Sequence, residues 1–312
     1  MTMKKNKKGI FFTMAAIALA LVLLLSLQTQ NTREFQDQAD VVSVRILAMN
    51  SFVKDVEQDL SKGLGIAGFR AIASINEIIA LNGTYIASLD TGFSELLLQG
   101  TIEGQQPSLM QYSTFTDWAD KIETQANKLG INVNFTIISV QLNQTNPWEV
   151  EIRAIINITL NDTKGTSSWK RQRTIMAPVK IIGFEDPLYL VGTSGKVTNT
   201  VIPSPIIQFV INGDVTNLLE HANASYYRAS ASAPNYLQRM QGLFANSSNG
   251  IESLVNVGEL DDQGVSIKDR SIVDYIYFGT KTTVNYRINN TPSWFKIDQG
   301  HLLFYEVENI TI

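Results

Sequence analysis

Near the N-terminus the chain reads KKNKKGIFFTMAAIALALVLLLSL over residues 4–27, a lysine cluster followed by an apolar span. The span covers residues 10–27 and holds no charged residue, with only Thr13 and Ser26 as polar interruptions. Eighteen helical residues rise by about 27 Å, close to the hydrocarbon thickness of a bilayer. The sequence therefore predicts one transmembrane helix here.

A second pattern follows and reads FQDQADVVSVRILAMNSFVKDVEQDL over residues 35–60. Its apolar residues recur in alternating steps of four and three, the a/d spacing of a heptad repeat. These seam positions are Phe35, Ala39, Val42, Ile46, Met49, Val53, Val56 and Leu60. No Pro or Gly interrupts residues 10–61, so we expect one helix of about 50 residues. The seam packs either on the protein's own globular part or on equivalent helices of other copies.

The composition of the 312-residue chain restricts its chemistry and its partners. Cysteine is absent, which excludes a disulfide framework and a Cys-based zinc site. Four of the 25 basic residues lie in residues 1–9, so 21 basic residues face 29 acidic ones over residues 10–312. An acidic surface of this kind makes nucleic acid an unexpected partner.

The position of the lysines predicts the orientation of the chain in the membrane. Basic residues flanking a span remain in the cytosol, so we expect a cytosolic N-terminus and a C-terminal domain outside the cell membrane. No small-x-small cleavage site follows Leu25, so the span is expected to remain as an anchor or to be cut on its cytosolic side. The expected parts are a basic leader (1–9), a transmembrane segment (10–27), an extramembrane continuation of the helix (28–61) and an extracellular α+β domain (62–312).

The junction of lysines and span resembles the class III leader of type IV prepilins, since Lys7, Lys8 and Gly9 directly precede Ile10. The resemblance implies that prepilin peptidase cuts between Gly9 and Ile10 and that the apolar helix stays on the mature subunit. It also implies self-association, or association with other pilin-like subunits, through the N-terminal helix. One position departs from the pattern, because pilins commonly carry Glu at the fifth mature position and Met14 stands there.

Four later segments are similar to stretches of archaeal membrane-anchored, pilin-like surface proteins. They read GFEDPLY over residues 183–189, APNYL over 233–237, GIESLVN over 250–256 and VDYIYF over 273–278. This resemblance names a family and implies no activity.

Short helices are expected directly after the long one. Gly63 is interpreted as the stop of the long helix, and a separate amphipathic helix is predicted over residues 66–81. Two more are predicted over residues 93–98 and 116–129, the latter capped by Thr116.

A sheet is expected next. Strict alternation predicts strands over residues 131–137 and 148–160, with a bulge at Ile137 and Ile138, and a weaker strand over 169–182 broken at Pro178. The expected arrangement is an antiparallel meander. Further strands are expected in the apolar segments 201–211, 272–278, 282–288 and 301–312. The predicted fold class is α+β: a long N-terminal transmembrane and heptad helix, short helices and a mostly antiparallel β head.

Motifs for catalysis and cofactor binding are scarce. His221 and His301 each stand alone, and a lone histidine is usually a packed or surface residue. The glycines of residues 63–68 match the dinucleotide-binding pattern G-x-G-x-x-G, but a helix precedes them where that motif needs a strand. Glu185 and Asp186 are interpreted as a turn before a strand, and no EF-hand spacing supports a calcium site. We therefore expect no catalytic residue, cofactor or metal ligand.

N-x-S/T sequons are about twice as frequent as composition predicts. All of them follow the span, on the expected outer side of the membrane. Their asparagines are Asn82, Asn134, Asn143, Asn157, Asn161, Asn223, Asn246, Asn289 and Asn309. The alternative is that an Asn/Thr-rich protein produces sequons by composition alone. The sequence predicts a glycoprotein.

The sequence favours a structural or adhesive surface protein without enzyme activity, a type IV pilin-like subunit or minor pilus component. The main alternative is a stand-alone membrane-anchored extracellular binding module. An anchored hydrolase is a lesser alternative, and it would need convergent polar groups in a pocket of the head.

Overall fold

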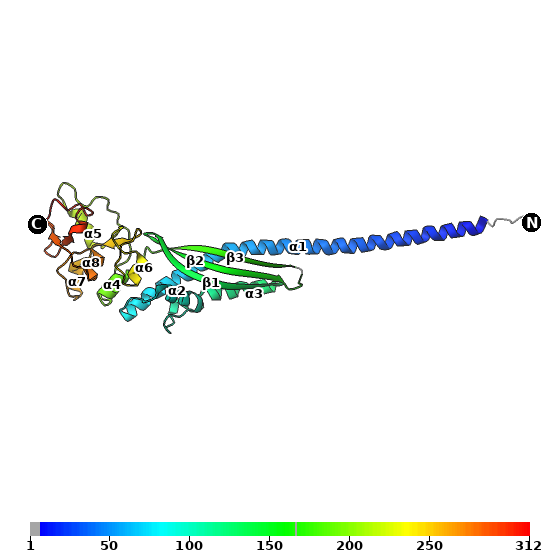
Figure 1. Ribbon diagram of the computed structural model, residues 1–312, viewed down its shortest axis with the longest axis horizontal. Helices are drawn as coiled ribbons and strands as arrows, with labels where there is room; N and C mark the ends of the chain where they lie inside the picture. The colour runs from blue at the N-terminus through cyan, green and yellow to red at the C-terminus, as the bar shows by residue number, and fades with distance from the viewer. Residues whose placement is uncertain (1–6, 166) are drawn as a thin grey trace, which may run out of the picture.

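The computed structural model describes residues 7–165 and 167–312, without the side chains of residues 7–13, 15 and 27–38. A single helix, α1 (Lys7–Asn82), projects far beyond the rest of the described chain, which gathers around its C-terminal half (Figure 1). Its 76 residues correspond to a length of about 114 Å. The fold combines this helix, shorter helices and an antiparallel sheet. The coarse α+β prediction is confirmed.

The interpretation of Gly63 as a helix stop is wrong, because α1 continues to Asn82 and includes the helix predicted over residues 66–81. The glycines allow close packing instead. A Cβ on Gly63 would lie 2.8 Å from the Trp118 ring, and one on Gly68 would lie 1.9 Å from Ile152 Cδ1. The G-x-G-x-x-G pattern thus lies inside a helix, which agrees with its rejection as a nucleotide motif.

Strands β1 (Ile131–Asn146), β2 (Glu149–Asp162) and β3 (Ser168–Lys180) form the predicted antiparallel meander in the order β1-β2-β3. The register shifts between Ile137 and Ser139, which confirms the predicted bulge. β3 is not broken at Pro178, which pairs with Glu151. Because β3 is an edge strand, a proline there removes no ladder hydrogen bond to a further strand.

Helices α2 (Leu89–Gln99) and α3 (Phe115–Lys128) pack beside α1, and η1 (Ser108–Met110) lies between them in the chain. They correspond to the helices predicted over residues 93–98 and 116–129. Thr114, and not Thr116, caps α3, in a capping box with Asp117. α1 lies against β3 and α3 lies against β1, so the helices cover one face of the sheet.

After β3 the chain forms a distal region at the end of the molecule remote from the N-terminus (Figure 1). Its elements are short: α4 (Pro187–Gly192), α5 (Thr216–Asn223), β4 (Tyr227–Ala229), α6 (Tyr236–Met240), β5 (Ile251–Ser253), α7 (Val257–Asp262), α8 (Asp274–Phe278), β6 (Asn285–Arg287), β7 (Lys296–Asp298) and η2 (Gln299–His301). β4 pairs with β5 and β6 pairs with β7, both antiparallel.

Most of the strands predicted for the distal region are wrong. Residues 201–211 form only isolated bridges, 272–278 mostly form helix α8, and 301–312 form turns; only 282–288 contains a strand, β6. Short apolar runs have no period that separates a buried strand from a buried helix or loop. The head is therefore not mostly β, because the three-stranded sheet lies beside α1 and the distal region adds only two pairs of three-residue strands.

Two hydrophobic cores hold the described chain together. The first lies between α1, α2, α3 and the inner face of the sheet, and the second lies within the distal region. β2 supplies every second residue to the first core, from Val150 to Leu160. The helix that emerges from the first core is therefore fixed rigidly to the head.

Candidate functional site

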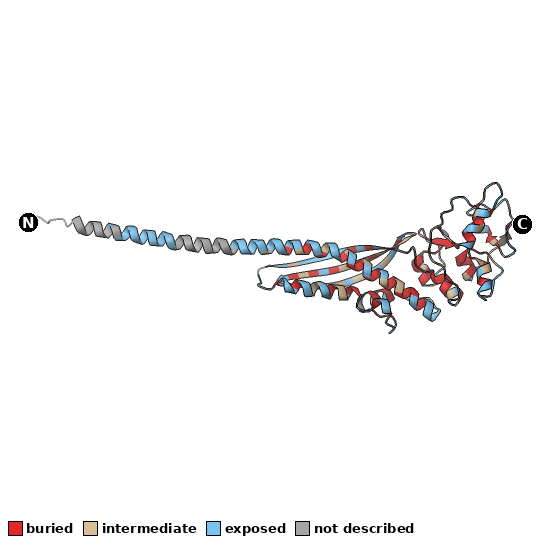
Figure 2. Cartoon of the chain, turned by 180° about the vertical axis from the view of Figure 1, so that it is seen from behind, coloured by how far each residue is buried: buried red, intermediate tan, exposed pale blue. Residues whose placement is uncertain are grey.

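Burial along α1 changes abruptly at Met49. Met49, Val53, Val56 and Leu60 are buried against the protein's own sheet, as the first alternative for the seam predicts. Upstream, Ala39 is exposed, and Val42 and Ile46 are 36% and 40% exposed. Figure 2 shows the described part of α1 that projects from the head coloured as exposed. Burial of Val42 and Ile46 within one chain is therefore not found. Phe35 lies outside the residues whose side chains are described.

Arg45 marks the boundary between these two parts of the helix. Its guanidinium donates to Asp162 Oδ1 from Nε (3.0 Å) and Nη2 (2.8 Å), and to the carbonyl oxygen of Gly130 (2.7 Å). Asp162 ends β2 and Gly130 directly precedes β1. One side chain thus ties α1 to two strand ends at the rim of the head.

Above this rim α1 is apolar on several sides. Its exposed apolar residues are Val41, Val42, Val44, Ile46 and Leu47. Exposed apolar side chains gathered in this way mark a surface that protein or lipid normally covers. We name residues 39–47 the collar of α1, and the collar is a candidate interface.

The described part of α1 contains one stretch long and apolar enough to cross a membrane, within Ala39–Asn82, but 56% of that window is buried in the head. Nearer the N-terminus, Ala16–Ser26 forms a shorter apolar segment in which every side chain is exposed. Met14, at the position that departs from the pilin pattern, is 71% exposed. Gly9 and Ile10 lie within α1, outside the residues whose side chains are described.

All nine sequon asparagines are exposed. Four of them, Asn134, Asn143, Asn157 and Asn161, lie on the outer face of the sheet, where the ladder pairs Asn134 with Thr159, Thr136 with Asn157 and Asn143 with Glu151. A glycan needs an accessible amide nitrogen, and these side chains meet that requirement. The inner face, covered by helices, carries none of them.

A buried ion-pair network joins the two cores. Arg239 on α6 is fully buried and its Nη1 lies 2.5 Å from Asp186 Oδ2 and 2.9 Å from Asp274 Oδ2. Its other donors reach Asp274 Oδ1 and the carbonyl oxygens of Ile251 and Pro234. Burial raises the pKa of Asp274 to about 6 despite the charge of Arg239. Asp186 caps α4 and so begins a helix, which corrects its interpretation as a turn before a strand.

A second buried cluster surrounds His301. Its Nδ1 lies 2.8 Å from Asp298 Oδ2, and its Nε2 lies 3.4 Å from Glu252 Oε2. Burial disfavours the charged ring, but the hydrogen bonds and charges of these two carboxylates outweigh it and raise the pKa of His301 to about 10. His301 is therefore a packed, charged residue of the distal core.

We expect the stability of the distal region to fall as pH rises from 7 toward 10. The folded-state pKa of His301 is above its ordinary value of 6.5, so its stabilisation is complete below pH 6.5 and is lost as pH passes 10. The loss should be about 3 kcal/mol in the free energy of unfolding. Urea titrations at pH 7 and 9.5 measure it. His301→Gln should flatten this dependence, and an equally steep fall in that variant would contradict the assignment.

His221 is the neutral counterpart. Its Nδ1 lies 3.0 Å from Ser204 Oγ, and its ring packs edge-on against Phe209 at 5.0 Å. Burial, aided by the charge of Arg228, lowers the pKa of His221 to about 3. His221 thus bonds a serine hydroxyl, and His301 Nε2 lies 3.0 Å from the hydroxyl oxygen of Tyr275. Both imidazole rings are buried.

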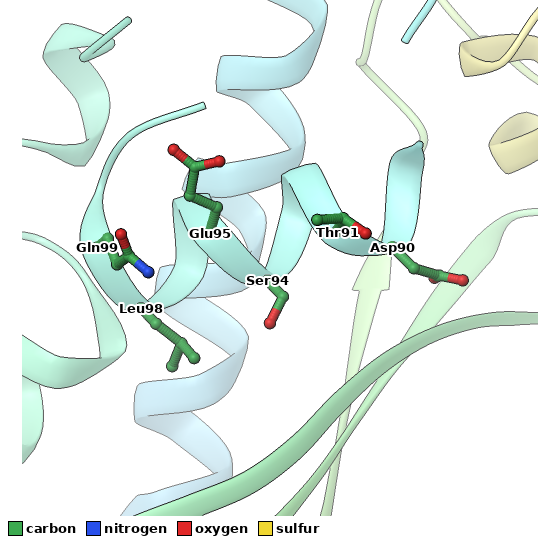
Figure 3. A pocket seen from close by; sticks show the side chains of 6 residues that line it. All are labelled: Asp90, Thr91, Ser94, Glu95, Leu98 and Gln99. Atoms are coloured by element: carbon green, nitrogen blue, oxygen red, sulfur yellow. The ribbon is translucent and has the colours of Figure 1, made fainter. Parts of the chain in front are cut away.

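One pocket, of about 570 Å³, lies on α2 and is lined by Asp90, Thr91, Ser94, Glu95, Leu98 and Gln99. Figure 3 shows these side chains spreading from a single helix instead of converging on one point. Within the described residues no three His, Cys, Asp or Glu side chains form a metal-binding group.

Comparison of the chain with protein-family models, with curated proteins and with solved structures finds no match. The seam and the sequons are visible in the sequence, whereas Arg239 and its two carboxylates are not. Asp186, Arg239 and Asp274 are far apart in the chain, and no local pattern links them.

Proposed function

We propose that this chain is a single-pass, outward-facing surface protein of the type IV pilin-like kind, with a structural or adhesive role. The observation that carries the proposal is the continuity of α1, which runs without a break from the apolar segment Ala16–Ser26 into the core of the head. A rigid helix of this kind holds the head at a fixed distance from the membrane or filament that contains its N-terminal part.

The collar supports self-association. The collar continues the heptad seam, whose residues from Met49 to Leu60 pack on the sheet of the same chain. From Ile46 toward the N-terminus the sheet no longer buries the seam. Ala39, Val42 and Ile46 keep the a/d spacing, which suits a parallel helix of a second copy. In this arrangement Ala16–Ser26 contacts lipid or the same helices of neighbouring subunits.

The lysines of residues 4–8 support a cytosolic N-terminus and a head outside the cell. The exposure of all nine sequon asparagines fits a glycosylated outer head. Removal of residues 1–9 by prepilin peptidase would free the helix for a filament, since four lysines at its end hold it at the membrane surface.

Protease added to intact cells should remove the head and leave a small membrane-embedded N-terminal fragment. The physical reason is that Lys and Arg side chains of the head would face the medium, while the apolar segment is shielded by lipid. Immunoblotting with tags at both ends measures the fragment. A head that survives in intact cells but is digested after lysis would reverse the orientation.

The second candidate function is a stand-alone anchored binding module. It would use the same anchor and head but leave the collar uncovered. Electron microscopy of labelled envelopes separates the two functions, because a pilus component labels filaments and an isolated module labels the membrane diffusely.

A further inference from the structure

The loop between α2 and α3 holds a tyrosine in a strained backbone conformation. Tyr112 has a φ of 55°, in the left-handed region that bulky residues rarely adopt. Among the described residues with positive φ it is the one aromatic. It is also 77% exposed, so burial of the ring does not offset the strain. Strained residues of this kind cluster at ligand sites.

Neighbouring contacts fix this conformation. Ser113 N donates to the carbonyl oxygen of Met110 (3.1 Å), and Arg70 of α1 donates to Ser113 Oγ. Lys121 Nζ lies 3.4 Å from the carbonyl oxygen of Tyr112. The next residue, Thr114, is locked in the capping box of α3. The ring is thus presented to solvent on a backbone held from both sides.

A pocket of about 360 Å³ opens beside this ring. The residues that line it include Gln99, Gln106 and Gln111, each of which carries a side-chain amide. In the described part of the chain these amides have no hydrogen-bond partner, so they are available to a ligand. Asp117 also lines the pocket; its Oδ2 accepts from Thr114, and its Oδ1 has no partner among the described residues.

The chemistry of this lining selects a class of ligand. Each amide offers both donors and an acceptor, which matches hydroxyl groups. An exposed aromatic ring packs against an apolar ring face. The residues that line the pocket include no lysine or arginine, and the carboxylate of Asp117 disfavours an anion. A neutral molecule with many hydroxyls and one apolar face fits all these groups.

We propose that the Tyr112 pocket binds a neutral carbohydrate, with the ring as a stacking platform and the three glutamines as hydrogen-bonding groups. The inference rests on the proposed adhesive function and names its ligand class. A sugar on another cell or in the surrounding envelope would then be the adhesion target of the head.

The test uses the full-length protein, purified in a detergent without a sugar headgroup, and immobilised conjugates of mannose, galactose, glucose and N-acetylglucosamine oligomers. We expect wild type to bind at least one conjugate. Tyr112→Gly should weaken that binding by about tenfold or more. The midpoint of thermal unfolding of this variant should equal that of wild type or exceed it by roughly 2–4 °C, because glycine relieves the backbone strain. Tyr112→Phe keeps the ring and should keep most of the binding.

Two adjacent glutamines provide a matched control. Gln106 lines the pocket and Gln105 does not, although both are exposed. Gln106→Ala should reduce binding, and Gln105→Ala should leave it unchanged. The proposal is overturned if wild type binds none of the conjugates, or if Tyr112→Gly binds as wild type does. Either failure leaves the membrane topology untouched, so the protease experiment on intact cells still decides the proposed function separately.

Discussion

Arg239→Met should lower the free energy of unfolding of the distal region by about 3–5 kcal/mol. The guanidinium is fully buried and bonds Asp186, Asp274 and two backbone carbonyls, so its removal leaves two carboxylates in the core without a cation. Urea unfolding followed by tyrosine fluorescence measures the loss. Because uncompensated carboxylates bind protons, the variant should regain stability as pH falls from 8 to 5.

The control for this prediction is another arginine of the same region. Arg287 on β6 is exposed, and Arg287→Met should change the free energy of unfolding by less than about 0.5 kcal/mol. Arg239→Lys should remain destabilising, since an ammonium cannot reach every acceptor that the guanidinium bonds. Equal stability of wild type and Arg239→Met would show that the network is not a structural element of the head.

Val53→Asp and Ile46→Asp should separate folding from assembly. Val53 is 4% exposed in the first core, so a carboxylate there should cost about 3–5 kcal/mol. Ile46 is 40% exposed in the collar, and the same change there should leave unfolding of the head within about 0.5 kcal/mol of wild type. We expect a second copy to cover the collar, so Ile46→Asp should abolish self-association while the head remains stable.

The chain has no cysteine, so a single introduced cysteine can form a disulfide only between two copies and thereby reports self-association. Val42→Cys places one thiol on the seam, next to Ile46, and should give cross-linked dimers when membranes are oxidised. Adding Ile46→Asp should remove these dimers, and adding Lys54→Asp, an exposed position off the seam, should not. Cross-linking that is insensitive to Ile46→Asp would mean that the collar is not the interface.

The parts of the fold with a long, regular pattern were predictable. Alternation over residues 148–160 identified β2, and the phase slip at Ile137 identified the bulge in β1. The helix through Met49 and Leu60 followed from its heptads. The helix stop predicted at Gly63 was wrong because glycine occurs both after helices and inside them at close contacts. The contact between Gly63 and the Trp118 ring, which distinguishes these two roles, is visible only in the structure.

The distal region was not predictable from local pattern. Its helices are five to eight residues long, too short for a period to show, and its stability depends on contacts between distant residues such as Arg239 and Asp274. The features of the candidate sites also differ in whether the sequence alone could reveal them. The sequons and the seam are sequence patterns, whereas the backbone conformation of Tyr112 depends on tertiary contacts, from Arg70 to Ser113 and from Lys121 to the carbonyl oxygen of Tyr112.

The intact mass of the native protein from cell membranes, combined with N-terminal sequencing, tests the anchored pilin-like account most directly. We predict a chain that begins at Ile10 and carries several glycan increments, since Gly9 ends the leader-like segment and all nine sequon asparagines are exposed. A chain that still begins at Met1 or Thr2, with the mass of the unmodified sequence, would contradict the pilin-like account.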